Sequence, residues 1–130
     1  MDRVIADSDV LVDLLLGAGA AAQVDALAAK GALATTAVNV FELERGCRRT
    51  AEREAVRRAL RGVRIYPLNA QAARRAAEVE HDLARRGAGI GERDTLVAGV
   101  ALATGLPLLT ANVEHFGRVA GLRVVKARRR

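Results

Sequence analysis

Cysteine, aromatic residues and proline are all scarce in this chain of 130 residues. The single cysteine, Cys47, excludes an intramolecular disulfide and a cysteine-based zinc site, so we expect a reducing, cytoplasmic location. Only Phe41, Tyr66 and Phe116 are aromatic, which leaves no evident platform for stacking nucleic-acid bases. Recognition of a nucleic acid would therefore depend on phosphate contacts and shape.

A long apolar run of the kind that crosses a membrane is also lacking. Residues 95–113 carry no charge, but Pro107 interrupts them, so we expect a buried helix followed by a short buried strand and no membrane span. Two acids, Asp2 and Asp7, come before any long apolar segment, whereas a secretory signal has a basic start followed by an apolar region. Export is therefore not expected.

Positive charge is plentiful and comes almost entirely from arginine. The net charge is +6, and only Lys30 and Lys126 are lysines, so the chain should attract a polyanion or an acidic protein. The densest arginine segment spans residues 45–64 and could follow RNA phosphates, although charged helix faces are often simply solvated. Its first three members are the candidate RNA contacts: Arg45, Arg48 and Arg49.

Short apolar runs alternate with segments of helical periodicity along the whole chain. Strands are expected at 3–6, 32–35, 63–67, 106–110 and 122–125. Helices are expected at 10–16, 20–30, 37–49, 51–60, 71–86 and 92–104, with Thr36 capping the third and a glycine-rich connection at 87–91. This alternation predicts one α/β domain over 1–130, a three-layer α/β/α arrangement with a mainly parallel sheet of about five strands and a short basic tail at 126–130.

In open parallel sheets, ligand sites form outside the carboxyl ends of the strands, so polar residues just after the predicted strands are the first candidates. Asp7 ends the first strand, and Asp94 lies in the first turn of the helix before the fourth. Glu42 lies mid-helix beside an apolar stripe, so it should not be fully solvated. Each acid has an ordinary structural explanation when taken singly: Asp9 as a helix cap, for example, and Asp94 as a favourable first-turn charge.

The chemical meaning lies in the set of acids. Three carboxylates within about 4 Å would repel one another by roughly 4 kcal/mol per pair at an effective dielectric of 20, so they would raise each other's pKa or hold a cation. Ligands that are all oxygen favour Mg²⁺ or Mn²⁺ over zinc. Such a metal would polarise a phosphodiester and lower the pKa of a water nucleophile.

Four motifs resemble those of PIN-domain ribonucleases, in particular the toxin half of VapBC toxin–antitoxin pairs. An apolar strand ends in Asp7, followed by Ser8. A polar residue, Thr36, is followed six positions later by Glu42 and then by a basic-glycine pair, and Asp94 opens a small-residue helix. The closing motif follows the fourth strand, with Thr110 and then Asn112 two residues later.

The resemblance covers essentially the whole chain and implies a PIN fold with Mg²⁺-dependent endoribonuclease activity, Mn²⁺ being a possible substitute. It implies that Asp7, Glu42 and Asp94 bind the metal and are catalytic. The residues implied to tune the second ligand sphere or position water are Ser8, Asp9, Thr110 and Asn112, and Glu114 is an open alternative at that position. The implied partners are RNA, a cognate antitoxin that inhibits the enzyme, and a second copy of the chain in a homodimer.

Two other functions fit parts of the sequence. Asp7 and Asp9 also resemble the opening motif of haloacid-dehalogenase-like phosphatases, but neither lysine is suitably placed and no adjacent acids occur late in the chain. A non-catalytic basic adaptor that binds RNA or protein is the second alternative, because Asn112 stands where many relatives have an acid. His81 and His115 have no convincing nucleophilic partner and are interpreted as surface or packing residues.

Overall fold

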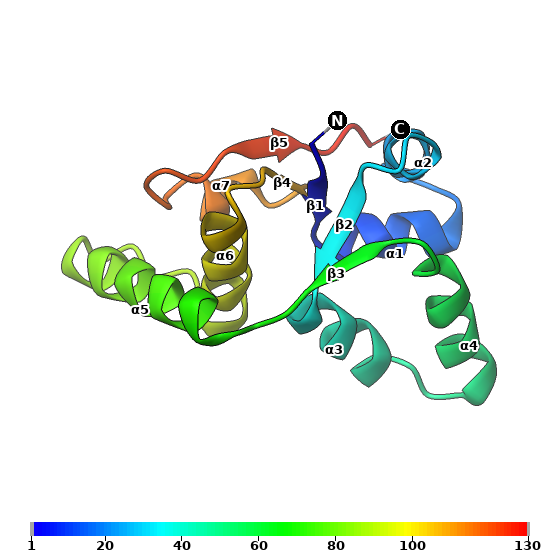
Figure 1. Ribbon diagram of the computed structural model, residues 1–130, viewed down its shortest axis with the longest axis horizontal. Coiled ribbons are helices and arrows are strands. Elements are labelled where there is room, and N and C mark those ends of the chain that lie inside the picture. Colours follow the sequence, from blue (N-terminus) through cyan, green and yellow to red (C-terminus); the bar gives the residue numbers. More distant parts are fainter. Residues whose placement is uncertain (1, 130) are drawn as a thin grey trace.

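A single parallel sheet runs through the middle of the computed structural model, which describes residues 2–129 (Figure 1). The five strands lie in the order β3-β2-β1-β4-β5, and every neighbouring pair is parallel. The expected α/β class and the mainly parallel five-stranded sheet are therefore confirmed. The strands are β1 (Val4–Ala6), β2 (Leu33–Thr36), β3 (Arg64–Tyr66), β4 (Leu108–Thr110) and β5 (Val124–Lys126).

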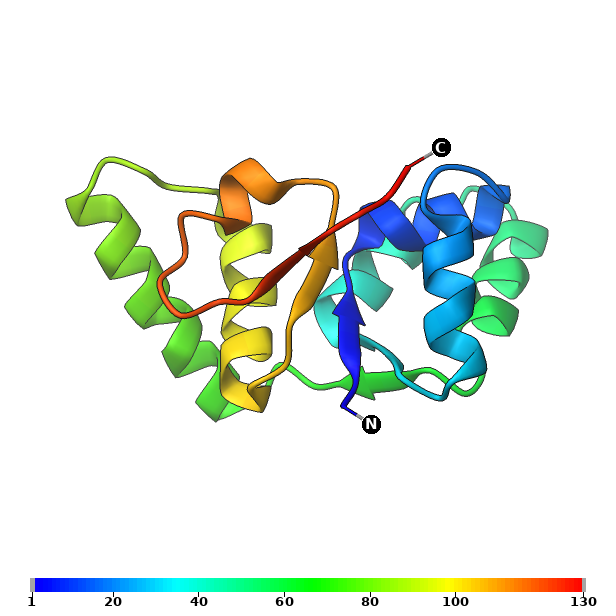
Figure 2. The same ribbon diagram turned by 90° about the horizontal axis from the view of Figure 1, so that it is seen from above.

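Helices cover both faces of this sheet (Figure 2). One group contains α5, α6 and α7, and the opposite face carries α1, α2 and α4, while α3 follows β2 at the carboxyl end of the sheet. The three layers follow from the right-handed crossovers that parallel strands require. The helices are α1 (Ser8–Leu16), α2 (Ala21–Ala29), α3 (Ala37–Arg45), α4 (Thr50–Ala59), α5 (Ala70–Arg85), α6 (Glu92–Thr104) and α7 (Val113–Phe116).

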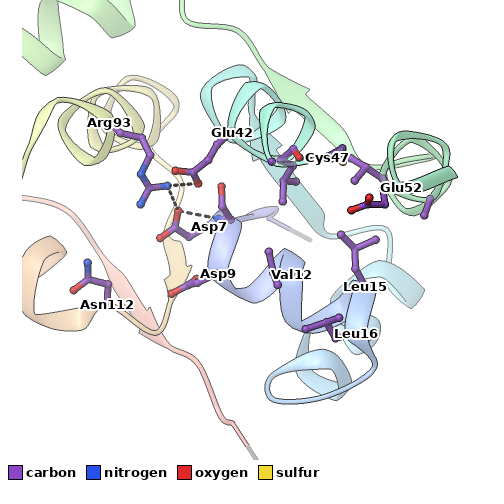
Figure 3. Close-up of a pocket in the computed structure, with 15 residues that line it drawn as sticks. Asp7, Asp9, Val12, Leu15, Leu16, Glu42, Cys47, Glu52, Arg93 and Asn112 are labelled. Atoms are coloured by element: carbon purple, nitrogen blue, oxygen red, sulfur yellow. Dashed lines mark hydrogen bonds and ion pairs between the residues drawn. The ribbon is translucent and has the colours of Figure 1, made fainter. Parts of the chain in front are cut away.

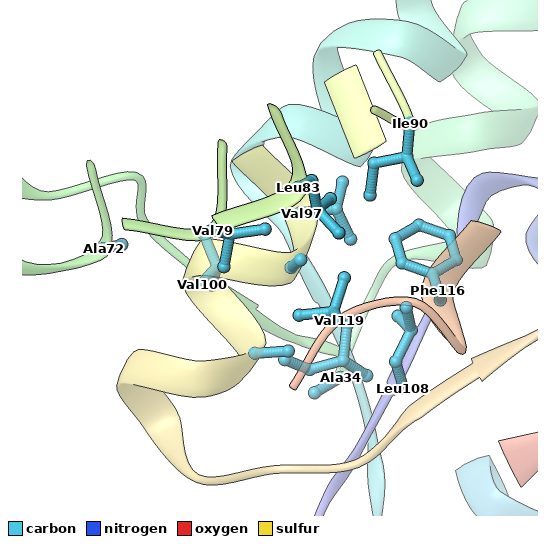
Figure 4. Packing of buried hydrophobic residues seen from close by; sticks show 13 residues of the cluster. Ala34, Ala72, Val79, Leu83, Ile90, Val97, Val100, Leu108, Phe116 and Val119 are labelled. Carbon is cyan, nitrogen blue, oxygen red and sulfur yellow. The ribbon is translucent and has the colours of Figure 1, made fainter. Parts of the chain in front are cut away.

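Alternating side chains of the central strands feed two separate cores. Ile5 and Leu108 point to the α5–α6 face, whereas their neighbours Ala6 and Leu109 point to the α1–α2 face. All four side chains are completely buried, which explains why these strands read as continuous apolar runs. The first core, shown in Figure 4, also includes Val79, Leu83, Val97, Val100, Phe116 and Val119.

The α5–α6 pair packs so closely that one helix position has no room for a side chain. A Cβ built at Gly99 would lie 2.6 Å from the carbonyl oxygen of Ala72 and 2.7 Å from the Cβ of Ala76. Backbone atoms cannot yield in the way that the end of a flexible side chain can. The small residues along both helices therefore set their separation, and with it the position of the first turn of α6.

Many predicted element ends differ from the structure by one or two residues, and three differences are more substantial. The helix expected at 37–49 ends at Arg45, because Gly46 caps it and the chain then turns to begin α4 at Thr50. The helix α7 was not predicted, since four residues are too short to show a period. The supposed basic tail begins inside β5 with Lys126, and Arg130 lies outside the described residues.

The uncharged segment 95–113 divides between α6 and β4, which confirms the expected helix and strand. Within residues 2–129, no single helix has both the length and the apolar composition needed to cross a bilayer. Only α1 and α2 taken together pass that test, and they are bent by 95° to each other.

Candidate active site

Asp7 lies at the carboxyl end of the central strand, between β1 and β4. The sheet order reverses direction at this point, which is where open α/β sheets form their ligand sites. Only 1% of Asp7 is exposed, and its backbone N–H donates to the carbonyl of Leu109 at 2.9 Å. It is also the N-cap of α1, because its Oδ1 accepts from the backbone N–H of Ser8 at 2.8 Å.

Neutral hydrogen-bond donors fix the Asp7 carboxylate. Asn39 Nδ2 donates to Asp7 Oδ1 at 3.1 Å and to Ser8 Oγ at 2.9 Å. Thr110 Oγ1 donates to the other carboxylate oxygen at 2.9 Å. Asn39 itself is fully buried and held by Thr36, whose hydroxyl donates to Asn39 Oδ1 at 2.7 Å and caps α3 as predicted. This buried polar network gives Asp7 a single orientation.

Asp9 faces the same end of β4 from the first turn of α1. Its Oδ2 accepts from the backbone N–H of Ala111 at 3.0 Å and lies 3.3 Å from Thr110 Oγ1. The interpretation of Asp9 as the helix cap is wrong, since Asp7 has that place. Its Oδ1 is buried, and no hydrogen-bond partner for that atom occurs among residues 2–129. A buried carboxylate oxygen without a donor has free capacity for a cation or a water molecule.

Asp7, Glu42 and Asp94 converge on the guanidinium of Arg93. Figure 3 shows the contacts with Asp7 and Glu42. Arg93 Nη1 lies 2.8 Å from Glu42 Oε1 and 3.3 Å from Asp7 Oδ1. Arg93 Nη2 contacts Asp94 Oδ1 directly. The three acids predicted to share a site thus come from β1, α3 and α6 to one positive centre.

The electrostatics of this cluster follow from burial and from the unequal number of charges. Burial raises the pKa of Asp7 above its usual 3.8, and the nearby charge of Asp9 adds to that effect, while Arg93 opposes it. Burial alone would lower the pKa of Arg93, but the charges of Asp7, Asp94 and Glu42 outweigh it and hold that pKa above its usual value. Arg93 is therefore a permanent cation among an excess of carboxylates.

The α7 segment completes one side of the cluster. His115 Nδ1 lies 3.1 Å from Asp94 Oδ2, so this residue, predicted to be a surface or packing residue, also contacts an acid of the cluster. Asn112 lines the pocket, and its Oδ1 accepts from the backbone N–H of His115 at 3.4 Å. Glu114, the open alternative of the fourth motif, instead pairs with Arg118 at 3.0 Å and is largely exposed.

A pocket of about 720 Å³ opens in front of the carboxylates. Its polar end is formed by Asp7, Asp9, Glu42 and Arg93, as Figure 3 shows. The apolar wall extends away from that end along α1, α3 and α4, and it consists of Val12, Leu15, Leu16, Leu43, Ala55 and Val56. Leu16 is 74% exposed, which is unusual for a leucine unless a partner covers it.

The three arginines proposed as RNA contacts are sequence neighbours of two residues that line this pocket. Arg45 ends α3, while Arg48 and Arg49 lie in the connection to α4, and all three are exposed. Gly46 and Cys47, between them in sequence, line the pocket itself. The contact of these three arginines with RNA stays a prediction.

The donor set of the cluster fits a hard divalent cation. Among residues 2–129, no three acidic, histidine or cysteine side chains are arranged to hold a metal as they stand, and the guanidinium of Arg93 lies where the three carboxylates meet. That position is nevertheless one at which three carboxylates meet a single cation, and Asp9 adds a buried oxygen without a donor. Oxygen ligands of this kind suit Mg²⁺ or Mn²⁺.

Sequence reasoning missed three members of the cluster: Asn39, Arg93 and His115. Asn39 had a usable signal, since it lies three residues after the capping Thr36, at the position whose backbone N–H the cap accepts from. Arg93 and His115 had none in a single sequence, because an arginine or histidine beside an acid is ordinary on a helix surface.

Comparison with known proteins gives a consistent result. The family model for the PIN domain matches residues 4–122. Ribonuclease VapC10 of Mycobacterium tuberculosis is 40% identical over 114 residues, covering 87% of this chain and 85% of that protein. VapBC2 of Rickettsia felis, in a structure bound to a DNA fragment from its promoter, has a TM-score of 0.84 at 20% identity and covers 95% and 98% of the two chains. A toxin–antitoxin complex from Klebsiella pneumoniae has a TM-score of 0.70 at 21% identity, over 99% and 100%.

Proposed function

Because the chain belongs to the PIN domain family, we propose that it is a divalent-metal-dependent endoribonuclease, the toxin of a toxin–antitoxin pair acting in the cytoplasm. The observation that carries the proposal is the convergence of Asp7, Glu42 and Asp94 on one cation position. The name of the relative from M. tuberculosis supports ribonuclease activity. Membership of this family leaves the phosphatase alternative without support.

The residues of the site would have two kinds of role, metal binding and the positioning of the metal-binding side chains. Asp7, Glu42 and Asp94 would hold Mg²⁺ or Mn²⁺, and Asp9 would offer its free oxygen to the metal's waters. When bound, the metal would polarise the scissile phosphate and lower the pKa of an attacking water. Thr110 and Asn39 keep the Asp7 carboxylate in one orientation, and Asn112 and His115 fix the α7 side of the site.

The surface around the pocket suits an RNA strand. Arg45, Arg48 and Arg49 are exposed and flank the pocket-lining Gly46 and Cys47 along the chain, so they would neutralise phosphates of a bound strand. Arg45 lies over the ring of Phe41, with its guanidinium carbon 5.1 Å from the ring centre. The exposed ring of Phe41 therefore offers one face on which a base could stack. The sequence alone did not suggest such a stacking face.

The proposal is tested by incubating the purified chain with a mixed RNA pool. We expect endonucleolytic cutting with Mg²⁺ or Mn²⁺, and no cutting when EDTA removes the metal. Cleavage should resume when the metal is restored, because the metal is needed for the reaction and not for folding. RNA binding without cutting under any metal would contradict the nuclease and favour the non-catalytic adaptor.

We further propose that a segment of an antitoxin binds over this pocket and blocks it in a toxin–antitoxin complex. The apolar wall along α1, α3 and α4 suits the apolar side chains of such a segment, and the carboxylate end would attract a basic residue from it. The toxin–antitoxin complex with a similar fold supports this kind of partner. The homodimer implied by the family resemblance stays a prediction.

Co-expression with the product of the adjacent gene tests this partner. The two proteins should co-purify, and the complex should cut RNA far more slowly than the free chain. Leu16→Asp should weaken the complex, because it places a charge on the exposed apolar wall, while Leu68→Asp, at an exposed leucine away from the pocket, should not. A neighbour that neither binds nor inhibits the chain would remove the support for a toxin.

A further inference from the structure

Arg93 is the centre of the carboxylate cluster, although no motif points to it. Its two terminal nitrogens contact three acids, Asp7, Glu42 and Asp94, that are separated from one another along the sequence and lie on different elements. The planar guanidinium presents several donors in a fixed fork, which matches this many-sided arrangement better than an ammonium could. The cluster is therefore organised around the charge of this one side chain.

Arg93 is also the only fully charged partner that these acids have within the described chain. The other contacts of Asp7 come from Ser8, Asn39 and Thr110, which are neutral donors. Glu42 has Arg93 as its sole side-chain partner among residues 2–129. Without this guanidinium, Asp7 and Glu42 would have no cationic partner among residues 2–129, and Asp94 would have only His115.

The guanidinium is held, but it is not locked in place. A third of the Arg93 side chain is exposed, and it lines the open pocket. Its backbone lies in the first turn of α6, which packs against α5 through Gly99 and does not depend on the side-chain contacts. Rotation of the long side chain would carry its charge into the pocket and leave the fold unchanged.

We propose that Arg93 is a built-in counter-ion that occupies the metal position of the free protein and that a divalent cation must displace it. This inference rests on the proposed function, since it concerns the same site. Two cations cannot share the position, because each would repel the other where the three carboxylates meet. The metal therefore binds only the fraction of molecules in which Arg93 has moved away, and its apparent affinity is reduced by that fraction.

Isothermal titration calorimetry of the full chain with Mn²⁺ alone tests this competition, because it measures the affinity for the metal directly. Arg93→Gln keeps a polar side chain of similar length and removes the charge, and we expect it to bind Mn²⁺ at least about tenfold more tightly than the wild type. The matched control is Arg85→Gln, which removes the same charge from an exposed arginine on α5 and should bind Mn²⁺ as the wild type does. Equal or weaker Mn²⁺ binding by Arg93→Gln would overturn the inference.

Thermal unfolding supplies a second readout that does not involve catalysis. In EDTA, Arg93→Gln should melt below the wild type, because its carboxylates have lost their counter-ion. Saturating Mn²⁺ should abolish that difference, since the metal then neutralises the same acids in both proteins. A difference in melting temperature that persists in Mn²⁺ would mean that Arg93 is a structural residue, and the inference would fail.

A conservative variant and the activity of the wild type distinguish a failure of this inference from a failure of the proposed function. If Arg93→Gln does not fold, Arg93→Lys decides: the lysine keeps the charge without the fork, so it should compete less and bind Mn²⁺ more tightly than the wild type. If the wild type cuts RNA with Mn²⁺ but neither variant binds the metal more tightly, only this inference is wrong. If no variant and no wild-type protein binds Mn²⁺, the inference and the proposed function both fail.

Discussion

Asp7→Asn should abolish metal-dependent cleavage of RNA, with a fall in rate of about 100-fold or more, because even residues outside the first shell of a metal site commonly cost 10–100-fold. The amide has no charge for a metal, yet it fits the same space. Its oxygen can still accept from Ser8 and Asn39, and the Thr110 hydroxyl can turn to accept from its amino group. The measurement is the cleavage rate at saturating Mg²⁺.

The fold should tolerate Asp7→Asn, because the raised pKa of Asp7 means that its negative charge destabilises the folded state. A carboxyl whose folded pKa lies above its unfolded value loses stability on ionisation, so at neutral pH without metal the charged Asp7 disfavours folding. Removing that charge offsets the loss of the Arg93 contact. Asp25→Asn on exposed α2 is the control and should cut RNA at the wild-type rate. Unimpaired cleavage by Asp7→Asn would show that the cluster is not the catalytic centre.

Phe116→Ala should lower the free energy of unfolding by about 3–5 kcal/mol, the usual cost of removing a fully buried phenylalanine from a core. Phe116 has no exposed surface and packs with Val97, Leu108 and Val119 (Figure 4). Domains of this size are stable by only about 5–15 kcal/mol, so the variant would lose a large share of its stability. Urea unfolding followed by circular dichroism measures the difference.

The other phenylalanine provides a matched control. Phe41 is 62% exposed and touches Arg45, so Phe41→Ala should cost no more than about 1 kcal/mol, the value of an exposed cation–π contact. Because Phe116 ends α7, its loss should also loosen Asn112 and His115 at the site. Equal unfolding free energies for the two variants would be incompatible with Phe116 as a core residue.

Most elements of the fold could be predicted because their signals are local. The cap at Thr36 and the bounds of α6 depend on residues within one turn of the helix start, and both are found where the sequence placed them. The apolar runs 3–6 and 32–35 mark the central strands, which are buried on both faces. The break after Arg45 was missed because Val40, Leu43 and Cys47 keep a helical period across it.

The sequence also located the acids of the site, but it did not reveal what holds them together. Asp7 was identified by its position after a strand, and all three acids, Asp7, Glu42 and Asp94, by their match to family motifs, and they do converge. Their common partner was not evident, because Arg93 reaches Asp7 across 86 residues and Glu42 across 51. Contacts over such separations depend on how the helices pack against the sheet, and a single sequence carries no record of that packing.

By itself, the sequence determined the α/β class, the parallel sheet, the oxygen-rich donor set and the absence of a disulfide, since these follow from local periodicity and residue type. Only the tertiary structure decided that Asp7 caps α1, that His115 meets Asp94, and that a guanidinium occupies the centre of the acids. The physical reason is that charge compensation in a buried cluster depends on the distances between groups. Those distances exist only after β1, α3, α6 and α7 have packed together.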